Sequence, residues 1–129
     1  MEEKFVKMFI KKQYQERLLF ELDSKKREKA IDRFSHEAKK LLKENLILTQ
    51  SEKIRQDDIQ KILSIKKNCK DVYIITLNSL YDKKFIKLEL ALTIFFDEYL
   101  PMIIVGETFA LIKQETSWNT SMKFVLSAT

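Results

Sequence analysis

Glycine is nearly absent from this sequence of 129 residues, in which Gly106 is the only one. An average usage of about 7% would give about nine. A chain so poor in glycine can form few turns that need a positive φ angle, so long helices and irregular polar loops must make most connections. The scarcity also excludes the glycine-rich phosphate loop, the dinucleotide-binding G-x-G-x-x-G turn and the G-x-S-x-G nucleophile elbow.

Cysteine and histidine are equally scarce, because Cys69 and His36 are the only ones. One cysteine cannot form an internal disulfide, and an unpaired thiol is typical of a reducing compartment. The two residues cannot complete a four-ligand zinc site without carboxylates or another chain. The sequence has no apolar run near the roughly 18 residues of a membrane span, and its start, MEEKFVKMF, does not resemble a signal peptide. We therefore expect a cytoplasmic protein with no membrane partner, no metal and no cofactor.

Charge is divided unevenly along the chain. Residues 1–70 hold 19 Lys and Arg against 12 Asp and Glu, a net charge of +7, whereas residues 71–129 hold 5 against 7, a net charge of −2. The two parts sum to the overall net charge of +5. Such a basic half is typical of proteins that bind nucleic acid or an acidic partner. Lysines that solvate long helices would give the same asymmetry, and we favour that interpretation.

Helical periodicity dominates the first half. Residues 2–22 carry one apolar stripe at three- and four-residue spacing, which predicts a single helix: Val6, Phe9, Ile10, Tyr14 and Leu18. A second helix is expected at 25–45, with its own stripe: Ala30, Ile31, Phe34, Ala38, Leu41 and Leu42. The two should pack as an antiparallel hairpin. A shorter helix is expected at 58–65, with Asp57 as its cap.

The second half mixes both periodicities. DVYIITL (71–77) predicts a buried strand, and strands are expected at 102–105, 108–115 and 122–127, with a tight turn at Gly106. Residues 85–97 fit either a strand or a helix that Pro101 ends, and their Leu, Ala and Glu content favours the helix. The helical alignment places Phe85, Leu88, Ala91, Leu92, Phe95 and Tyr99 on one face.

These elements predict an α+β fold. N-terminal helices pack on a small C-terminal mixed sheet of about four strands, with one further helix. The hydrophobic content of 45% and the absence of a linker favour a single domain over 1–129, with a helical half (1–68) and a mixed β/α half (69–129).

The basic face of the second helix is one candidate site. If the apolar stripe faces the core, His36 points to solvent and joins a ridge with Lys29, Arg33, Lys40 and Lys43. Ser35 cannot serve as a nucleophile for His36, because neighbouring helical residues do not face each other. The ridge is interpreted as a solvated helix face or as a contact for phosphates or an acidic partner.

Two further residues are candidate contact residues. Arg17 falls inside the apolar stripe of the first helix, so we expect it to pair with Glu21 at the edge of the core, or to reach a carboxylate of the second half. Trp118 stands in the polar stretch ETSWNTS, where it contacts a partner or folds back over the sheet edge. The candidate partner-binding residues are therefore Arg17, Arg33, His36, Lys40 and Trp118.

Carboxylates are the only possible catalytic groups. Asp57–Asp58, Asp97–Glu98, Glu107 and Glu115 show no recognisable catalytic or metal-binding spacing. We expect all of them at helix ends or on the surface, so no catalytic residue and no metal ligand is predicted.

The C-terminal half resembles a pattern found in small bacterial proteins, including immunity-type partners of polymorphic toxins. The residues that carry the resemblance are "YIITLN…LELALTIFFDEYLPMIIVGETFALIKQET…MKFVLS", in particular Pro101, Glu115 and KFVL. The resemblance implies that the protein neutralises a partner by binding rather than by catalysis.

Our leading hypothesis is thus a non-catalytic cytoplasmic interaction protein of the immunity type, with another protein as partner and self-association left open. The alternative is a nucleic-acid-associated protein that uses the face of Lys29, Arg33, His36, Lys40 and Lys43. A carboxylate-dependent hydrolase is a third hypothesis.

Overall fold

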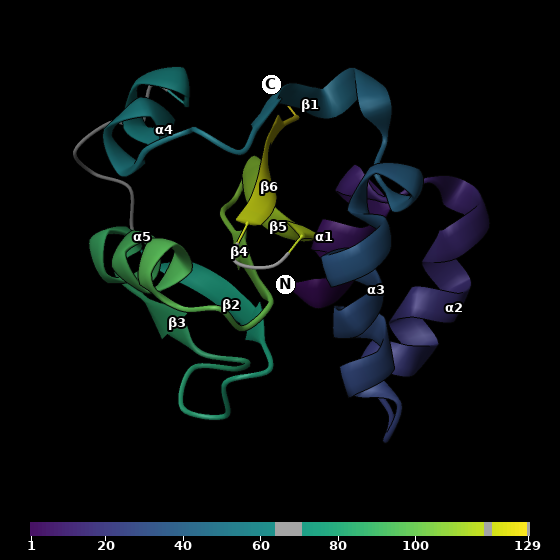
Figure 1. Ribbon diagram of the computed structural model, residues 1–129. Coiled ribbons are helices and arrows are strands. Elements are labelled where there is room, and N and C mark those ends of the chain that lie inside the picture. Colours follow the sequence, from purple (N-terminus) through teal and green to yellow (C-terminus); the bar gives the residue numbers. More distant parts are fainter. Residues whose placement is uncertain (64–70, 118–119, 129) are drawn as a thin grey trace.

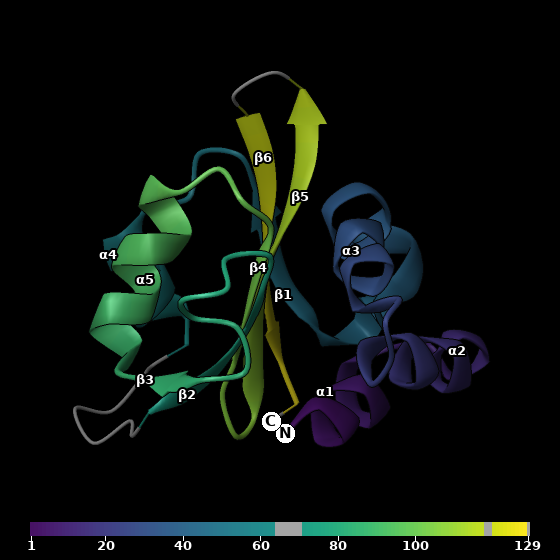
Figure 2. The same cartoon turned by 90° about the horizontal axis from the view of Figure 1, so that it is seen from below.

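A six-stranded antiparallel sheet lies between two helical layers. The computed structural model describes residues 1–63, 71–117 and 120–128. Figure 2 shows the sheet edge-on, with α1 (Glu2–Phe9), α2 (Lys12–Leu22) and α3 (Arg27–Leu41) on one side. Helices α4 (Gln56–Ile62) and α5 (Leu88–Asp97) cover the other side. The strands are β1 (Ile47–Ser51), β2 (Val72–Thr76), β3 (Phe85–Ile86), β4 (Met102–Val105), β5 (Phe109–Ser117) and β6 (Thr120–Ser127).

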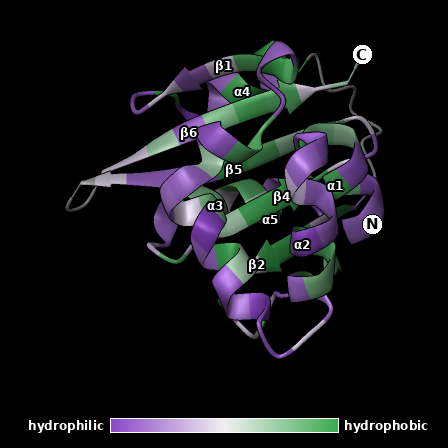
Figure 3. Cartoon of the chain, turned by 90° about the vertical axis from the view of Figure 1, so that its right-hand side faces the viewer, coloured by the Kyte–Doolittle hydropathy of each residue, from purple (hydrophilic) through white to green (hydrophobic). Residues whose placement is uncertain are grey.

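The strand order is β1-β6-β5-β4-β2-β3, and every pairing between these described strands is antiparallel. The α+β class is therefore confirmed. The expected sheet of about four mixed strands is wrong, because the sheet has two additional strands, β1 and β3, and no parallel pair among its described strands. Strands β5 and β6 also extend past the helical layers as a projecting arm (Figures 2 and 3).

Both additional strands lie at the sheet edges, where one side of the strand faces water. Strand β1 alternates between half-buried and exposed positions, with Leu48 and Gln50 exposed. It comes from the half that was expected to be helical, and it follows a 3₁₀ turn at Glu44–Leu46. Strand β3 has only two residues and pairs with β2 across a turn in which Lys83 has a φ of 64°. Short, half-exposed edge strands carry little apolar pattern, so sequence periodicity does not detect them.

The single helix expected at 2–22 is two helices. Ile10 is extended, and it forms an isolated bridge with Leu42. The Lys11 amide donates to the Leu41 carbonyl at 2.9 Å, and the Lys43 amide donates to the Phe9 carbonyl at 2.8 Å. These tertiary bonds replace intrahelical ones, so the helix ends without any glycine or proline. The predicted apolar stripe is nevertheless confirmed across the break, because Leu18 is buried and Tyr14 packs against the same core as Val6, Phe9 and Ile10.

Helix α3 confirms the expected apolar stripe, although it is shorter than 25–45. All six residues of that stripe are at most 2% exposed: Ala30, Ile31, Phe34, Ala38, Leu41 and Leu42. The helix ends at Leu41 because Leu42 is extended and pairs with Ile10. Glu37, with φ −131° and ψ 24°, is a non-helical residue inside α3.

The helical interpretation of residues 85–97 is confirmed from Leu88 onward, and the strand interpretation is wrong there. Two of the expected core residues are misplaced, since Phe85 is 55% exposed in β3 and Tyr99 is 84% exposed beyond the helix end. The expected strands at 71–77, 102–105, 108–115 and 122–127 correspond to β2, β4, β5 and β6. The helix expected at 58–65 begins earlier, as α4, and residues 64 and 65 lie outside the described part of the chain.

Alternate strand residues fill one hydrophobic core on each face of the sheet. Ile75, Ile112 and Phe124 pack against α1, α2 and α3, whereas Leu111 and Val125 pack against α4 and α5. In Figure 3 hydrophilic residues line the outer surfaces of α2 and α3 in front of the hydrophobic strands. In the described residues no helix is long and apolar enough to cross a membrane.

The turn at Gly106 is confirmed, and close packing explains its glycine. The Gly106 amide donates to the Phe109 carbonyl at 2.9 Å. A Cβ atom at this position would lie 2.2 Å from the Phe109 ring. Because that ring is itself buried, no larger residue fits here without displacing it.

Candidate functional site

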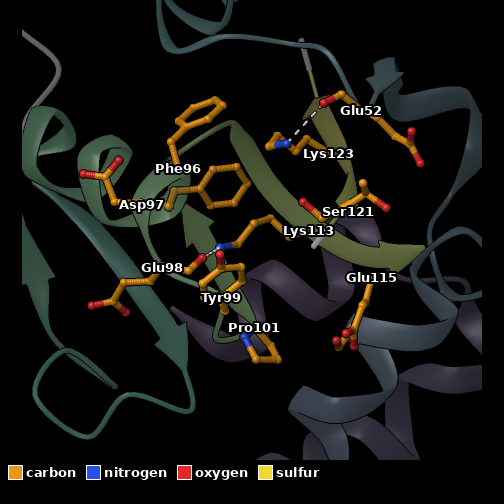
Figure 4. A pocket seen from close by; sticks show the side chains of 13 residues that line it. Glu52, Phe96, Asp97, Glu98, Tyr99, Pro101, Lys113, Glu115, Ser121 and Lys123 are labelled. Carbon is orange, nitrogen blue, oxygen red and sulfur yellow. Dashed lines mark hydrogen bonds between the residues drawn. The ribbon is translucent and has the colours of Figure 1, made fainter. Parts of the chain in front are cut away.

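A pocket of about 360 Å³ opens where the C-terminal end of α5 meets the base of the β5–β6 arm (Figure 4). Its wall residues come from α5 and the following segment, from β5 and β6, from the connection after β1, and from α3. They include the aromatic rings Phe95 and Phe96, the lysines Lys113 and Lys123, and the residues Glu98 and Glu52.

Lys113 is the most unusual residue of this pocket. Side chains alternate along a strand, so Lys113 lies on the same face of β5 as the buried Leu111. Lys113 is only 7% exposed. Its Nζ donates to the Glu98 carbonyl oxygen at 2.8 Å and lies 5.1 Å from the centre of the Phe95 ring. The ammonium is thus held by one carbonyl and one aromatic face.

Lys123 is the cross-strand partner of Lys113 on β6. Its Nζ donates to the Glu52 carbonyl oxygen at 3.4 Å and lies 5.6 Å from the centre of the Phe96 ring. Like charges directly opposite each other across an antiparallel pair destabilise a sheet. The cross-strand pairing thus holds two cations next to each other at the base of the β5–β6 arm, at a cost in stability.

The nearby glutamate side chains do not neutralise this pair. Both carboxylate oxygens of Glu98 accept hydrogen bonds from Asn78 Nδ2, at 3.2 and 3.1 Å. Glu52 Oε1 accepts from the Thr116 hydroxyl at 2.7 Å. Figure 4 shows the Glu98 carboxylate directed away from Lys113, and Glu115 directed away from both lysines. Among the described residues no carboxylate lies within 4.0 Å of either ammonium.

The surroundings lower the pKa of both lysines. Burial, and then the charge of Lys123, lower the pKa of Lys113 to about 8, against the opposing effect of Glu98. Burial also lowers the pKa of Lys123, and Glu52 opposes this change. At neutral pH Lys113 remains largely a cation, in an environment that disfavours the charge.

Exposed apolar side chains stand at the rim. Tyr99 lines the pocket and is 84% exposed, and its neighbour Leu100 is 42% exposed. They lie between the end of α5 at Asp97 and Pro101, whose carbonyl accepts from the Thr76 hydroxyl at 2.7 Å. A proline and a partly buried hydrogen bond thus fix the segment that presents the tyrosine.

The basic ridge expected on α3 is not continuous. His36 is exposed as predicted, with Nε2 3.5 Å from Asp32 Oδ1. Arg33 instead turns toward α2, where its Nη2 donates to Glu21 Oε2 at 3.1 Å. Lys43 lies beyond the helix end and donates to the Lys7 carbonyl at 2.9 Å. Lys29 and Lys40 are exposed, so the five cations do not form one free row.

The placement of Arg17 toward the core is wrong. Its side chain is 67% exposed, and the buried member of the expected pair is Glu21, 5% exposed, with 4.0 Å between Arg17 Nε and Glu21 Oε1. The buried residues of α2 are Leu18, Glu21 and Leu22, so Arg17 lies beside this face and not on it. Trp118, the remaining candidate, lies outside the described residues.

The candidate carboxylates lie on the surface or at helix ends. Glu107 and Glu115 are exposed, and Asp58 Oδ2 accepts from the Arg55 amide at 2.9 Å at the start of α4, where Asp57 was expected as the cap. Within residues 1–63, 71–117 and 120–128 no group of three or more His, Cys, Asp and Glu side chains could hold a metal ion.

A second polar cluster joins the helical layer to the β2–β3 turn, and it is fully paired. Arg27 donates to Glu2 Oε1 at 2.7 Å and Oε2 at 2.8 Å, to Asp82 Oδ2 at 2.8 Å and Oδ1 at 2.9 Å, and to the Leu22 carbonyl at 3.0 Å. Tyr73 donates to the same Glu2 carboxylate. Burial alone would lower the pKa of Arg27, but Asp82 and Glu2 raise it above its usual value. Burial, and then Glu2, raise the pKa of Tyr73.

Sequence reasoning missed both lysines of the pocket, although a signal for them exists. In FALIK the alternation that buries Phe109 and Leu111 also places Lys113 on the buried face, and in KFV Lys123 shares a face with Val125. The basic half of the chain drew attention to α3 instead. Tyr99 was assigned to the core because the helix was extended too far.

Comparison of this chain with protein-family models, with curated proteins and with solved structures finds no match. The resemblance to immunity-type proteins therefore stays a hypothesis, and the site must be interpreted from its own chemistry.

Proposed function

We propose that this chain is a non-catalytic interaction protein that binds another protein with the surface around the pocket. This surface consists of the pocket lysines Lys113 and Lys123 together with Tyr99 and Leu100 at the rim. The observation that carries the proposal is the 84% exposure of Tyr99 on a segment fixed by Pro101, next to two cations that pair with no carboxylate of the described residues. Tyrosine is enriched among the residues that dominate binding energy at interfaces.

Charge supports an acidic partner. The pocket presents two ammonium groups that no described carboxylate pairs with, and the net charge of the whole chain, which includes both, is +5. Complementary charge across an interface accelerates association and suppresses wrong partners. In its specific form the proposal is an immunity-type role in the cytoplasm, in which the partner is a toxin with an acidic contact surface.

The nucleic-acid alternative receives less support. Phosphate binding by α3 requires several free cations on one face, but Arg33 is paired with Glu21 and Lys43 with a backbone carbonyl. The exposed Asp32 also lies beside His36. Negative charge on the same helix face opposes the approach of a phosphate backbone.

The proposal is tested with the purified chain as bait in an extract of its native cell. Tyr99→Ala removes the exposed ring, and Phe20→Ala is the matched control, since Phe20 is another exposed aromatic residue (65%) on α2 in the other helical layer. We expect one protein to be retained in stoichiometric amount by the wild type and by Phe20→Ala, and to be lost or weakened at least tenfold by Tyr99→Ala. Retention of that protein by both variants with equal affinity, or retention of no protein, would overturn the proposal.

A further inference from the structure

We infer that the pocket is a receptor for a single carboxylate, in which the ammonium groups of Lys113 and Lys123 together bind an Asp or Glu side chain of the partner protein. This inference rests on the proposed function and names the chemistry that the partner must present. It goes beyond that proposal because it identifies the group that enters the pocket and the two residues that hold it.

Unused hydrogen-bond donors support the inference. A lysine ammonium has three N–H donors and no acceptor. Lys113 uses one of them on the Glu98 carbonyl, and Lys123 uses one on the Glu52 carbonyl. Within the described residues neither ammonium makes a further hydrogen bond, so each keeps two N–H groups beside a cavity of about 360 Å³. An anion between the two lysines would accept these bonds and remove the repulsion between cross-strand neighbours.

The local scaffold holds both ammonium groups in place for such a ligand. Lys113 lies over the Phe95 ring and Lys123 over the Phe96 ring, at 5.1 and 5.6 Å from the ring centres. The two rings are themselves packed edge to face, 5.5 Å apart. Long lysine side chains that are already ordered lose less conformational entropy when they bind.

The pocket wall favours a monoanion over a dianion. Four acidic residues also line the pocket: Glu52, Asp97, Glu98 and Glu115. Their carboxylates lie outside ion-pair distance of the lysines, but they still add negative potential around the opening. A carboxylate brings one charge into this field, whereas a phosphate at neutral pH brings up to two. The exposed Tyr99 at the rim offers contact area for residues that flank a carboxylate on a protein.

The same geometry makes binding depend on pH. Several charged groups line the pocket around Lys113: Asp97 from α5, Glu98 just beyond its end, Lys123 from β6, Glu115 from β5 and Glu52 from the connection after β1. Together with burial, Lys123 lowers the pKa of Lys113 to about 8, so the free protein loses this proton just above neutral pH. A carboxylate requires the ammonium form, and its affinity should fall up to about tenfold per pH unit above pH 8.

The test uses small anions rather than the partner. Acetate and inorganic phosphate are titrated at constant ionic strength, set with chloride, while NMR follows the side-chain signals of Lys113 and Lys123. We expect saturable shifts of both lysines with acetate at a millimolar dissociation constant, and weaker binding of phosphate. Lys113→Met should weaken acetate binding at least tenfold. Lys87→Met, which changes an exposed lysine at the start of α5, should leave it unchanged.

Three results would overturn the inference: no saturable shift at acetate concentrations of order 100 mM, equal acetate binding by Lys113→Met and wild type, or tighter binding of phosphate than of acetate. Binding experiments with the partner protein distinguish the carboxylate site from the proposed function. Acetate binding without a retained partner contradicts the proposed function and leaves the carboxylate site intact. A partner that Lys113→Met binds as tightly as the wild type contradicts the carboxylate site and leaves the proposed function intact.

Discussion

Arg27 and Lys113 are both basic side chains that the fold removes from water, but their surroundings are opposite. Arg27 donates all five of its N–H groups, and two carboxylates neutralise it. Lys113 donates to one carbonyl, and its nearest cross-strand neighbour is a second lysine. A saturated ion cluster holds parts of a fold together, whereas an unsaturated pair of cations costs stability until a ligand completes it. In our proposal this difference separates a structural site from a binding site.

The largest effect is expected at Arg27. Arg27→Met leaves the Glu2 and Asp82 carboxylates, 19% and 20% exposed, without their common cation. We expect a loss of about 3 kcal/mol in the free energy of unfolding, because breaking a buried pair strands its partners. Urea denaturation measures this loss, with Lys29→Met at an exposed side chain of the same helix as the control. A loss below about 1 kcal/mol would mean that the cluster is not structural.

A second, smaller loss is expected where a buried carboxylate depends on one arginine. Glu21 Oε2 accepts from Arg33, and Glu21 Oε1 is buried with no hydrogen-bond partner in the described part of the chain. Arg33→Met should therefore destabilise the protein by about 1–3 kcal/mol, the cost of leaving a buried acceptor unpaired. The matched control is Lys40→Met on the same helix, where the side chain is exposed. Equal stability of the two variants would show that Arg33 belongs to a free surface ridge after all.

At Lys113 we expect substitution to increase the free energy of unfolding instead of lowering it. Lys113→Met keeps the apolar stem and removes the buried charge, so we expect a gain of about 1–2 kcal/mol at pH 7, together with loss of acetate binding. The pKa of Lys113 is about 8 in the folded chain, below its ordinary value of 10.5. The cost of the charge is therefore complete below pH 8 and is relieved as pH rises toward 10.5, because the unfolded state then holds more protons.

Urea denaturation at several pH values from 7 to about 9, where tyrosine is still mostly protonated, tests this sign. The stability advantage of Lys113→Met over the wild type should shrink across that range. A variant that is less stable than the wild type at pH 7 would show that the lysine has a structural role like that of Arg27.

The smallest effect is expected at His36, which is neither buried nor part of a saturated cluster. His36→Ala should change the free energy of unfolding by no more than about 0.5 kcal/mol, because the side chain is 55% exposed. The same denaturation experiment checks this. A loss above about 1 kcal/mol would place His36 with the structural residues.

The sequence pattern predicted the buried stripe of α3, the buried stripe of α5 from Leu88 onward, and the strands on either side of Gly106. It could do so because each of these elements has a strongly apolar face. It failed where a distant segment decides the local structure. The break at Ile10 depends on the strand-like pairing with Leu42, and the edge strand β1 depends on the neighbouring β6. Neither partner is visible in a local window of sequence.

The candidate site was harder to predict than the fold. The ridge on α3 followed from helical spacing alone, yet Arg33 and Lys43 find partners on α2 and α1 that spacing cannot reveal. The pocket combines a cross-strand pair with a helix end, so its residues are far apart in the sequence: Lys113 and Lys123 from the arm, Phe95 from α5 and Glu98 just beyond the end of that helix. The one sequence signal for the inward position of Lys113 was strand alternation, and this signal was missed.

The most direct test of this account is the NMR titration of the Lys113 ammonium group with pH, in the absence and presence of acetate. Without the anion the account predicts a pKa of about 8 for Lys113. At saturating acetate the pKa should rise, because a bound carboxylate stabilises the ammonium form. A pKa close to the ordinary lysine value, unchanged by acetate, would contradict the claim that Lys113 and Lys123, which pair with no described carboxylate, form a binding site.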